Sequence, residues 1–124
     1  DNGSSAISNS NYYKAVVFRN TSNSDDGIAK NSSGSRIDYF IGTDNATSTK
    51  TGGAINYLYN LGDSTKYSYF TQHGMQHNSN NTTEYYSYGG GMLRETGVHN
   101  AIYLYTQTGA NMYGKFSLYG VKGY

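Results

Sequence analysis

The sequence predicts an all-β domain, an antiparallel sandwich or barrel of about eight short strands. Three observations indicate this class: short segments with period-two alternation, turn residues at nearly every boundary between them, and no segment with a convincing 3.6-residue period. The chain has 16 glycines and no proline, so its turns depend on Gly, Asn, Asp and Ser. At 124 residues it is expected to form one domain.

We expect strands where apolar or aromatic residues alternate with polar ones, or where β-branched and aromatic residues cluster. The expected strands are Tyr12–Arg19, Arg36–Gly42, Ala54–Leu61, Lys66–His73, Glu84–Tyr88, Met92–Arg94, Ala101–Thr106 and Lys115–Val121. Between them we expect a polar loop at Asn20–Gly34, a bend at Gly74–Thr83 and a turn at Gly89–Gly91. Residues 1–11, rich in Ser, Asn and Gly, are expected to form a flexible arm or linker ahead of a domain at 12–124.

The alternation also assigns faces. Within Ala54–Leu61, the residues Ile55, Tyr57, Tyr59 and Leu61 share one face. The last two expected strands read as a hairpin closed by a longer loop. Its aliphatic face is expected in the core and its tyrosyl face outside; the aliphatic residues are Ile102, Leu104, Phe116 and Leu118, and the tyrosines are Tyr103 and Tyr105.

Composition predicts a thin core and an aromatic exterior. The chain has 15 tyrosines, few aliphatic residues and a formal net charge of +1. Tyrosine suits sheet faces, subunit contacts and sugar-binding surfaces, because its ring is apolar and its hydroxyl needs a partner or water. The scattered basic residues argue against nucleic acid as a partner. No cysteine is present, and no apolar run approaches the ~18 residues of a membrane span, so neither disulfides nor membrane insertion are expected.

The last third of the chain carries a family resemblance in three segments, GGGMLRET, HNAIYLYTQTG and YGKFSLYGVKGY. They resemble the C-terminal signature of small jelly-roll domains in bacteriophage virion proteins, which end in an LYGIK-like strand. The matching positions are Gly89–Gly91, Ile102, Leu104, Gly114, Phe116 and Leu118–Lys122. Family members often have a Trp after the glycines, where this chain has Met92 and Leu93. The resemblance implies a jelly-roll sandwich at 12–124 and a location on the virion, an extracellular particle.

No constellation of residues predicts catalysis, a cofactor or a metal. His73, His77 and His99 could meet at a metal with Glu84, but histidines in an Asn-rich bend are more often exposed. The Asp25–Asp26 pair lacks the other ligands of a calcium loop and indicates a turn. The P-loop-like spacing from Gly109 to Lys115 is followed by a strand pattern instead of a helix, so we expect a hairpin loop there. The carboxylates show no pairing typical of a glycosidase.

The expected function is therefore that of a non-enzymatic structural domain of a phage virion, displayed on the tail, a fibre or the head, with a role in assembly or host attachment. Its expected partners are other copies of itself, with a trimer favoured from the resemblance, and other virion proteins. The alternative is a carbohydrate-binding module for a host-surface or extracellular glycan. In either case the expected contact surface is tyrosyl: Tyr57, Tyr59, Tyr86, Tyr88, Tyr103 and Tyr105.

Overall fold

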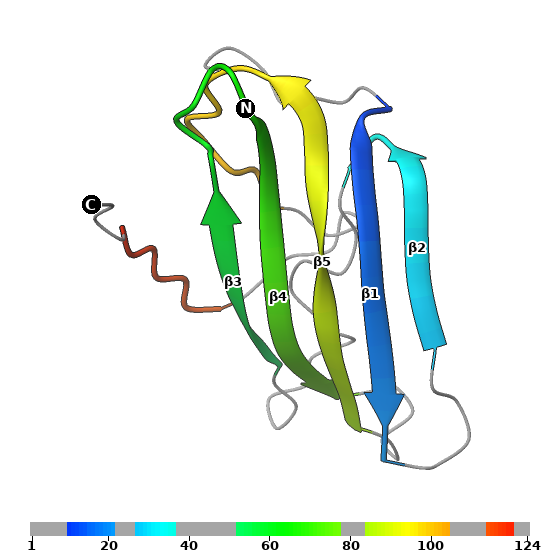
Figure 1. The fold of residues 1–124 in the computed structure, drawn as a ribbon. Helices are drawn as coiled ribbons and strands as arrows, with labels where there is room; N and C mark the ends of the chain where they lie inside the picture. Colours follow the sequence, from blue (N-terminus) through cyan, green and yellow to red (C-terminus); the bar gives the residue numbers. More distant parts are fainter. Residues whose placement is uncertain (1–9, 22–26, 37–51, 78–83, 105–113, 121–124) are drawn as a thin grey trace.

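The computed structural model describes residues 10–21, 27–36, 52–77, 84–104 and 114–120. Five strands make up the regular structure of these residues, and Figure 1 shows them side by side in one twisted sheet. The strands are β1 (Tyr12–Asn20), β2 (Gly27–Gly34), β3 (Gly53–Tyr59), β4 (Tyr67–His77) and β5 (Glu84–Thr96). No helix occurs in this described part, and the prediction of an all-β antiparallel fold is confirmed.

The spatial order of the strands is β2-β1-β5-β4-β3, and every neighbouring pair is antiparallel. The sheet therefore consists of a β1–β2 hairpin and a β3–β4–β5 meander, joined where the first strand pairs with the last. The longest strand, β5, lies at the centre, so its backbone donors and acceptors face partners on both sides. The edges are formed by β2 and β3.

Strand β2 corrects the expectation of a polar loop over Asn20–Gly34. Its sequence, GIAKNSSG, has little apolar character, and most of its side chains are exposed. An edge strand needs only one hydrogen-bonded neighbour and no buried face of its own. Its pairing with β1, from Val17 opposite Ile28 to Lys14 opposite Asn31, is therefore sufficient to hold it.

The three consecutive glycines correct a second expectation, because Gly89–Gly91 lie inside β5 and form no turn. A Cβ on Gly89 would lie 2.2 Å from the carbonyl oxygen of Ala15, and one on Gly91 would lie 2.3 Å from that of Tyr13. A Cβ on Gly90 would meet the carbonyl oxygen of Phe70 at 2.5 Å. Both neighbouring strands thus approach β5 too closely for any side chain here, which is a recognised reason for glycine within a strand. Similarly, β4 continues through Gly74 to His77, so the expected bend does not begin at Gly74.

The connection from β3 to β4 is a turn held by side chains. Asn60 adopts a left-handed backbone conformation with φ of 58°, which asparagine tolerates better than most residues, and its Nδ2 donates to the carbonyl of Tyr67 at 3.2 Å. The Asp63 carboxylate accepts hydrogen bonds from the Thr65 backbone and hydroxyl and pairs with Lys66 at 3.0 Å. The hydrogen bonds from Thr65, and then from Lys66, lower the pKa of Asp63 to about 2.

One face of the sheet, the rear face, holds the core, and that core is small and partly polar. Its buried apolar residues are Val16, Phe70 and Leu93. Between them lie buried polar residues, of which Gln72 is completely inaccessible and donates from Nε2 to the Ser87 hydroxyl at 3.0 Å. The amide oxygens of Asn56 and Gln72, residues opposite each other on β3 and β4, are buried without a hydrogen-bond partner.

The expected C-terminal hairpin is wrong in the part that the structure describes: residues 101–104 and 114–120 are in no strand. Of the predicted core residues of this hairpin, Phe116 is 53% exposed and Leu118 84%, whereas Leu104 is half-buried. Ile102 is exposed as well. Figure 1 shows residues 114–120 away from the sheet on the β3 side. Alternation alone could not reveal this, because it reports how a strand would divide its side chains and not whether a partner strand exists.

Other expectations fall outside the described residues. Of the arm at 1–11, only Ser10 and Asn11 are described, and the Asn11 carbonyl accepts from the Arg94 backbone at 2.9 Å. The expected strand at Arg36–Gly42 is described only at Arg36, where there is no strand. No helix of the described residues is long and apolar enough to span a membrane.

Candidate functional site

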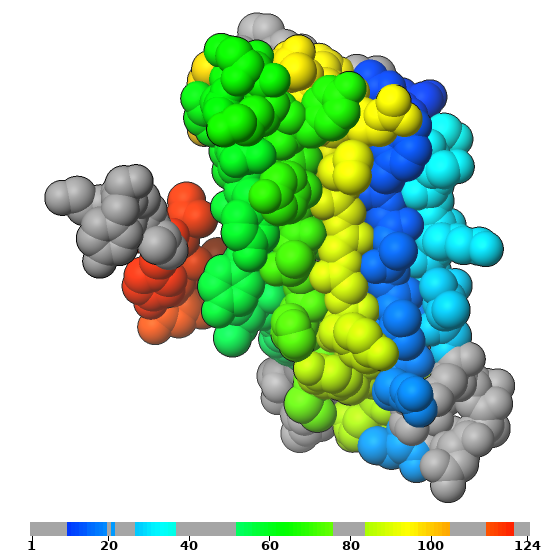
Figure 2. Space-filling view, viewed as in Figure 1, coloured from blue at the N-terminus to red at the C-terminus, as the bar shows by residue number. Residues whose placement is uncertain are grey.

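The opposite side of the sheet, here called the front face, carries large apolar side chains that are open to solvent. Figure 2 shows this side, on which the five strands run next to one another and no described segment crosses them. Ile55 is 64% exposed and Tyr57 54%. The exposed large residues of the front face are Ile28, Ile55, Tyr57, Tyr59, Tyr69, Met75, Tyr86, Tyr88 and Met92. Such a continuous exposed patch indicates an interaction surface.

The aromatic rings of the front face are held by contacts with each other. Tyr59 and Tyr69, opposite each other on β3 and β4, stack with ring centroids 4.7 Å apart and planes at 17°. Tyr86 and Tyr88 lie 6.1 Å apart in a tilted arrangement. The Tyr86 hydroxyl is 2.9 Å from Nδ1 of His73. These pairs order the rings before any partner arrives, which lowers the entropy lost on binding.

The strand register arranges the front face in rows that run across the strands. The central row contains Thr71, Gly90 and Ala15, with Tyr57 at one end and Lys30 at the other. We call it the small-residue row. The row on one side of it, the Tyr88 row, contains Ile55, His73, Tyr88, Val17 and Ile28. The row on its other side, the Tyr59 row, contains Tyr59, Tyr69, Met92 and Tyr13.

At the centre of the front face, the small residues of this row, Thr71, Gly90 and Ala15, lie between two rows of larger side chains. Thr71 and Ala15 are exposed even though both belong to strands inside the sheet. Gly90 contributes no side chain, for the packing reason given above. The requirement for glycine within β5 therefore also shapes the surface.

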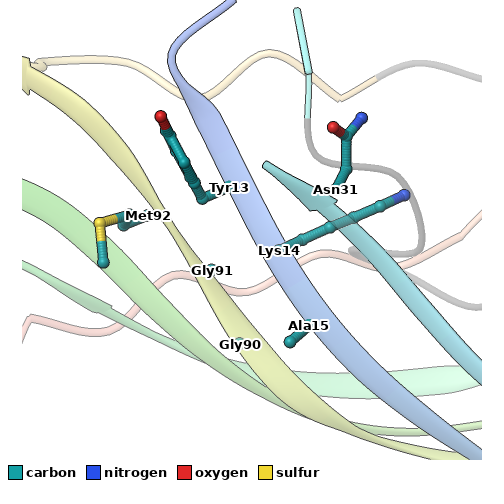
Figure 3. A pocket seen from close by; sticks show the side chains of 7 residues that line it. All are labelled: Tyr13, Lys14, Ala15, Asn31, Gly90, Gly91 and Met92. Carbon is teal, nitrogen blue, oxygen red and sulfur yellow. The ribbon is translucent and has the colours of Figure 1, made fainter. Parts of the chain in front are cut away.

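A cavity of about 260 Å³ lies where β1 and β5 contribute Ala15 and Gly90 to this row. Figure 3 shows its lining residues, which are Tyr13, Lys14, Ala15, Asn31, Gly90, Gly91 and Met92. Next to it, the Arg94 guanidinium lies over the Tyr13 ring, 5.2 Å from its centroid, and donates to the Tyr13 hydroxyl at 3.1 Å. The cavity thus has a largely apolar lining, with the Arg94 guanidinium held against one of its lining residues.

The structure brings together four of the six tyrosines expected from the sequence to form a contact surface. Tyr57, Tyr59, Tyr86 and Tyr88 lie on the front face. Tyr103 is 68% exposed but belongs to no strand, and Tyr105 lies outside the described residues. The sequence reasoning missed Tyr13, Tyr69 and Met92, although the alternation in YSYFTQHGM could have placed Tyr69 beside Tyr59.

The histidines do not converge in the described part of the chain. His73 lies on the front face, whereas His99 is buried and hydrogen-bonded through Nδ1 to the Ser68 hydroxyl at 2.6 Å. Only the backbone of His77 is described; it pairs with Glu84. No group of three or more His, Asp or Glu side chains among the described residues is placed to hold a metal ion, and Asp25 and Asp26 lie outside them.

The Ser68–His99 pair resembles a nucleophile and a base in its distance, but its environment is that of a structural contact. Both residues are 5% exposed, so a substrate has no path to the Ser68 hydroxyl. The backbone N–H of His99 also donates to the Leu61 carbonyl at 2.7 Å. Burial lowers the pKa of His99 below its ordinary value, while the charge of Glu95 opposes that shift. Together these hydrogen bonds hold the segment after β5 against β4 and the β3–β4 turn.

Comparison with models of protein families, with curated proteins and with solved structures gave no match in any of the three.

Proposed function

We propose that this chain is a non-enzymatic domain displayed on a bacteriophage particle, on the tail, a fibre or the head, and that it attaches the particle to the host surface through its front face. The observation that carries the proposal is the set of ordered, exposed aromatic and aliphatic side chains on that face. The viral setting rests on the resemblance of the last third of the chain, and the attachment role on the exposed patch.

The proposal includes the jelly-roll sandwich that the resemblance of the last third of the chain implies. In the single chain, Ile102, Phe116 and Leu118 expose apolar surface. This exposure supports an arrangement in which neighbouring copies cover these residues, and the resemblance favours a trimer. Other virion proteins are the second class of partner proposed for the same surface.

A carbohydrate-binding module that acts outside a virion is the second candidate. The small-residue row between two rows of larger side chains favours it, since sugar-binding sites combine aromatic surfaces with a few polar groups. Both candidates require the front face to stay open when the protein assembles. If the front face stays open in the assembled protein, it is available for attachment; if it is buried between subunits, it is an assembly surface.

The experiment compares the full chain with a variant in which Tyr57 and Tyr88 are both replaced by Ser. Binding of the fluorescently labelled domain to a panel of bacterial cell envelopes is measured, together with the melting temperature and the mass by light scattering. We expect the variant to lose at least tenfold in envelope binding with little change in melting temperature, since both side chains are exposed. A domain that binds no envelope, or a variant that binds as well as the parent chain, would overturn the attachment role.

The matched variant for assembly is Phe116→Ser, which lies outside the front face. We expect it to lower the mass measured at micromolar concentration from that of a trimer to that of the 13.6 kDa chain, with envelope binding per domain retained. A parent chain that scatters only as a monomer would contradict the trimer.

A further inference from the structure

We propose that the small-residue row is a binding site for a single chain of an acidic oligosaccharide, which lies across the strands with its sugar rings against the flanking aromatic side chains and a carboxylate at Lys30. This inference rests on the proposed attachment function and specifies the ligand class of the same face.

The row has the shape required for a linear polymer. It crosses all five strands, and neighbouring strands are about 4.8 Å apart, so Tyr57 and Lys30 at its ends are separated by about 19 Å. Two residues along a strand span about 7 Å, so the Tyr88 row and the Tyr59 row are about 14 Å apart, with the small-residue row midway between them. A single chain of pyranose rings fits between borders at this spacing.

The borders supply the groups that sugars use. Tyr88 and Tyr69, on either side of the row, each offer a ring that can pack on the C–H face of a sugar and a hydroxyl that can accept or donate. Thr71 adds a hydroxyl on the floor. The cavity beside Tyr13 and Met92 provides a place for one ring to sit below the level of the neighbouring side chains.

The charge of the site selects the class of glycan. None of the described residues in the three rows is a carboxylate, whereas Lys30 ends the small-residue row and Arg94 lies over Tyr13 at its border. A cationic end within an otherwise neutral aromatic site complements the carboxylates of uronic acids.

The experiment uses calorimetric titration of the full chain with hexasaccharides of galacturonic acid and of mannuronic acid, and with the matching neutral hexasaccharides of galactose and mannose. We expect at least one acidic hexasaccharide to bind more tightly than its neutral counterpart, and the difference to shrink at high salt because exposed charges are screened. If the neutral sugars bind equally well, the acidic specificity is wrong.

Three variants locate the site. Thr71→Trp raises the floor of the row and is expected to weaken binding more than tenfold; Lys30→Gln is expected to weaken it about two- to fivefold, the range for one exposed ion pair. Lys115→Gln removes another exposed lysine, which lies outside the sheet, and is expected to leave the affinity unchanged. Unchanged affinity in Thr71→Trp would overturn the site.

The envelope assay separates this inference from the function on which it rests. If the parent chain and Thr71→Trp bind envelopes equally and neither binds any hexasaccharide, the front face attaches by another chemistry, such as protein contact, and the row is not its site. If the parent chain binds no envelope, the attachment function itself fails.

Discussion

The two faces of the sheet differ in what happens to their large side chains. The rear face buries Phe70 and Leu93 together with the polar Gln72, whereas the front face exposes rings as large as those of Tyr57 and Tyr88. The centre of the sheet is narrow, because the neighbouring strands approach Gly89–Gly91 too closely for a side chain. The difference shows that burial in this protein depends on which face a residue occupies and on close backbone approach as well as on side-chain size.

The largest expected effect comes from filling that narrow centre. Gly91→Ala would place a methyl group 2.3 Å from the Tyr13 carbonyl oxygen and 2.7 Å from the Phe70 ring. Because backbone must move to accommodate it, we expect the free energy of unfolding to fall by about 3 kcal/mol or more. Gly53→Ala is the control: a Cβ there meets nothing within 4 Å, and we expect a change within about 0.5 kcal/mol. Urea unfolding measures both, and equal midpoints would show that the strands are not tightly spaced.

Neighbouring residues of β4 test the two faces directly. Phe70 is 3% exposed on the rear face. Its replacement by Ala is expected to lower the free energy of unfolding by about 3–5 kcal/mol, through lost burial and a residual cavity. Tyr69→Ala on the front face removes its stacking on Tyr59 and is expected to cost only about 1 kcal/mol. A lower urea midpoint for Tyr69→Ala than for Phe70→Ala would show that the front face contributes more to stability than the rear face.

A smaller effect is expected from acid, through the buried His99. Its folded-state pKa lies below the ordinary value of 6.5, so the unfolded chain takes up the proton first as the pH falls. The contribution of neutral His99 to the free energy of unfolding is therefore fully present above about pH 6.5, and it declines as the pH falls through and below that value. Urea midpoints from pH 8 to pH 5 should decrease in the parent chain and flatten in His99→Asn. An equally steep decrease in the variant would assign the pH dependence to other groups.

The smallest effect is expected from Tyr86→Phe, which removes the hydroxyl near His73 and keeps the ring. Because this hydrogen bond is exposed to water, we expect the free energy of unfolding to fall by no more than about 0.5 kcal/mol. Tyr57→Phe, with its exposed ring on β3, serves as the control. A loss above 2 kcal/mol in Tyr86→Phe would mean that the front face contributes to folding as strongly as the rear face does.

The sequence was sufficient to predict strands that carry their own apolar pattern. Tyr12–Arg19 and Ala54–Leu61 correspond to β1 and β3, and Ile55, Tyr57 and Tyr59 share a face as the period-two rule requires. Strand β2 could not be predicted in this way, because an edge strand held by one neighbour needs no apolar residues.

The errors share a physical cause: a local sequence pattern carries no information on how closely neighbouring strands approach each other. Glycine marks both a turn and a close approach of backbones, and only the positions of Ala15 and Phe70 distinguish the two at Gly89–Gly91. The candidate site was predictable as a tyrosyl surface, since four of the named tyrosines share the front face. The small-residue row was not, because it is formed by single residues from five strands whose register depends on the whole sheet.

The glycine backbone at the centre of β5 also has a consequence for how the protein can change over generations. Since the glycines and the rear side chains hold the sheet, exposed front residues such as Tyr57, Thr71 or Lys30 can be exchanged one at a time without dismantling the fold. Single substitutions can therefore change the chemistry of the front face at little cost in stability, whereas substitutions in the scaffold beneath are expected to be destabilising.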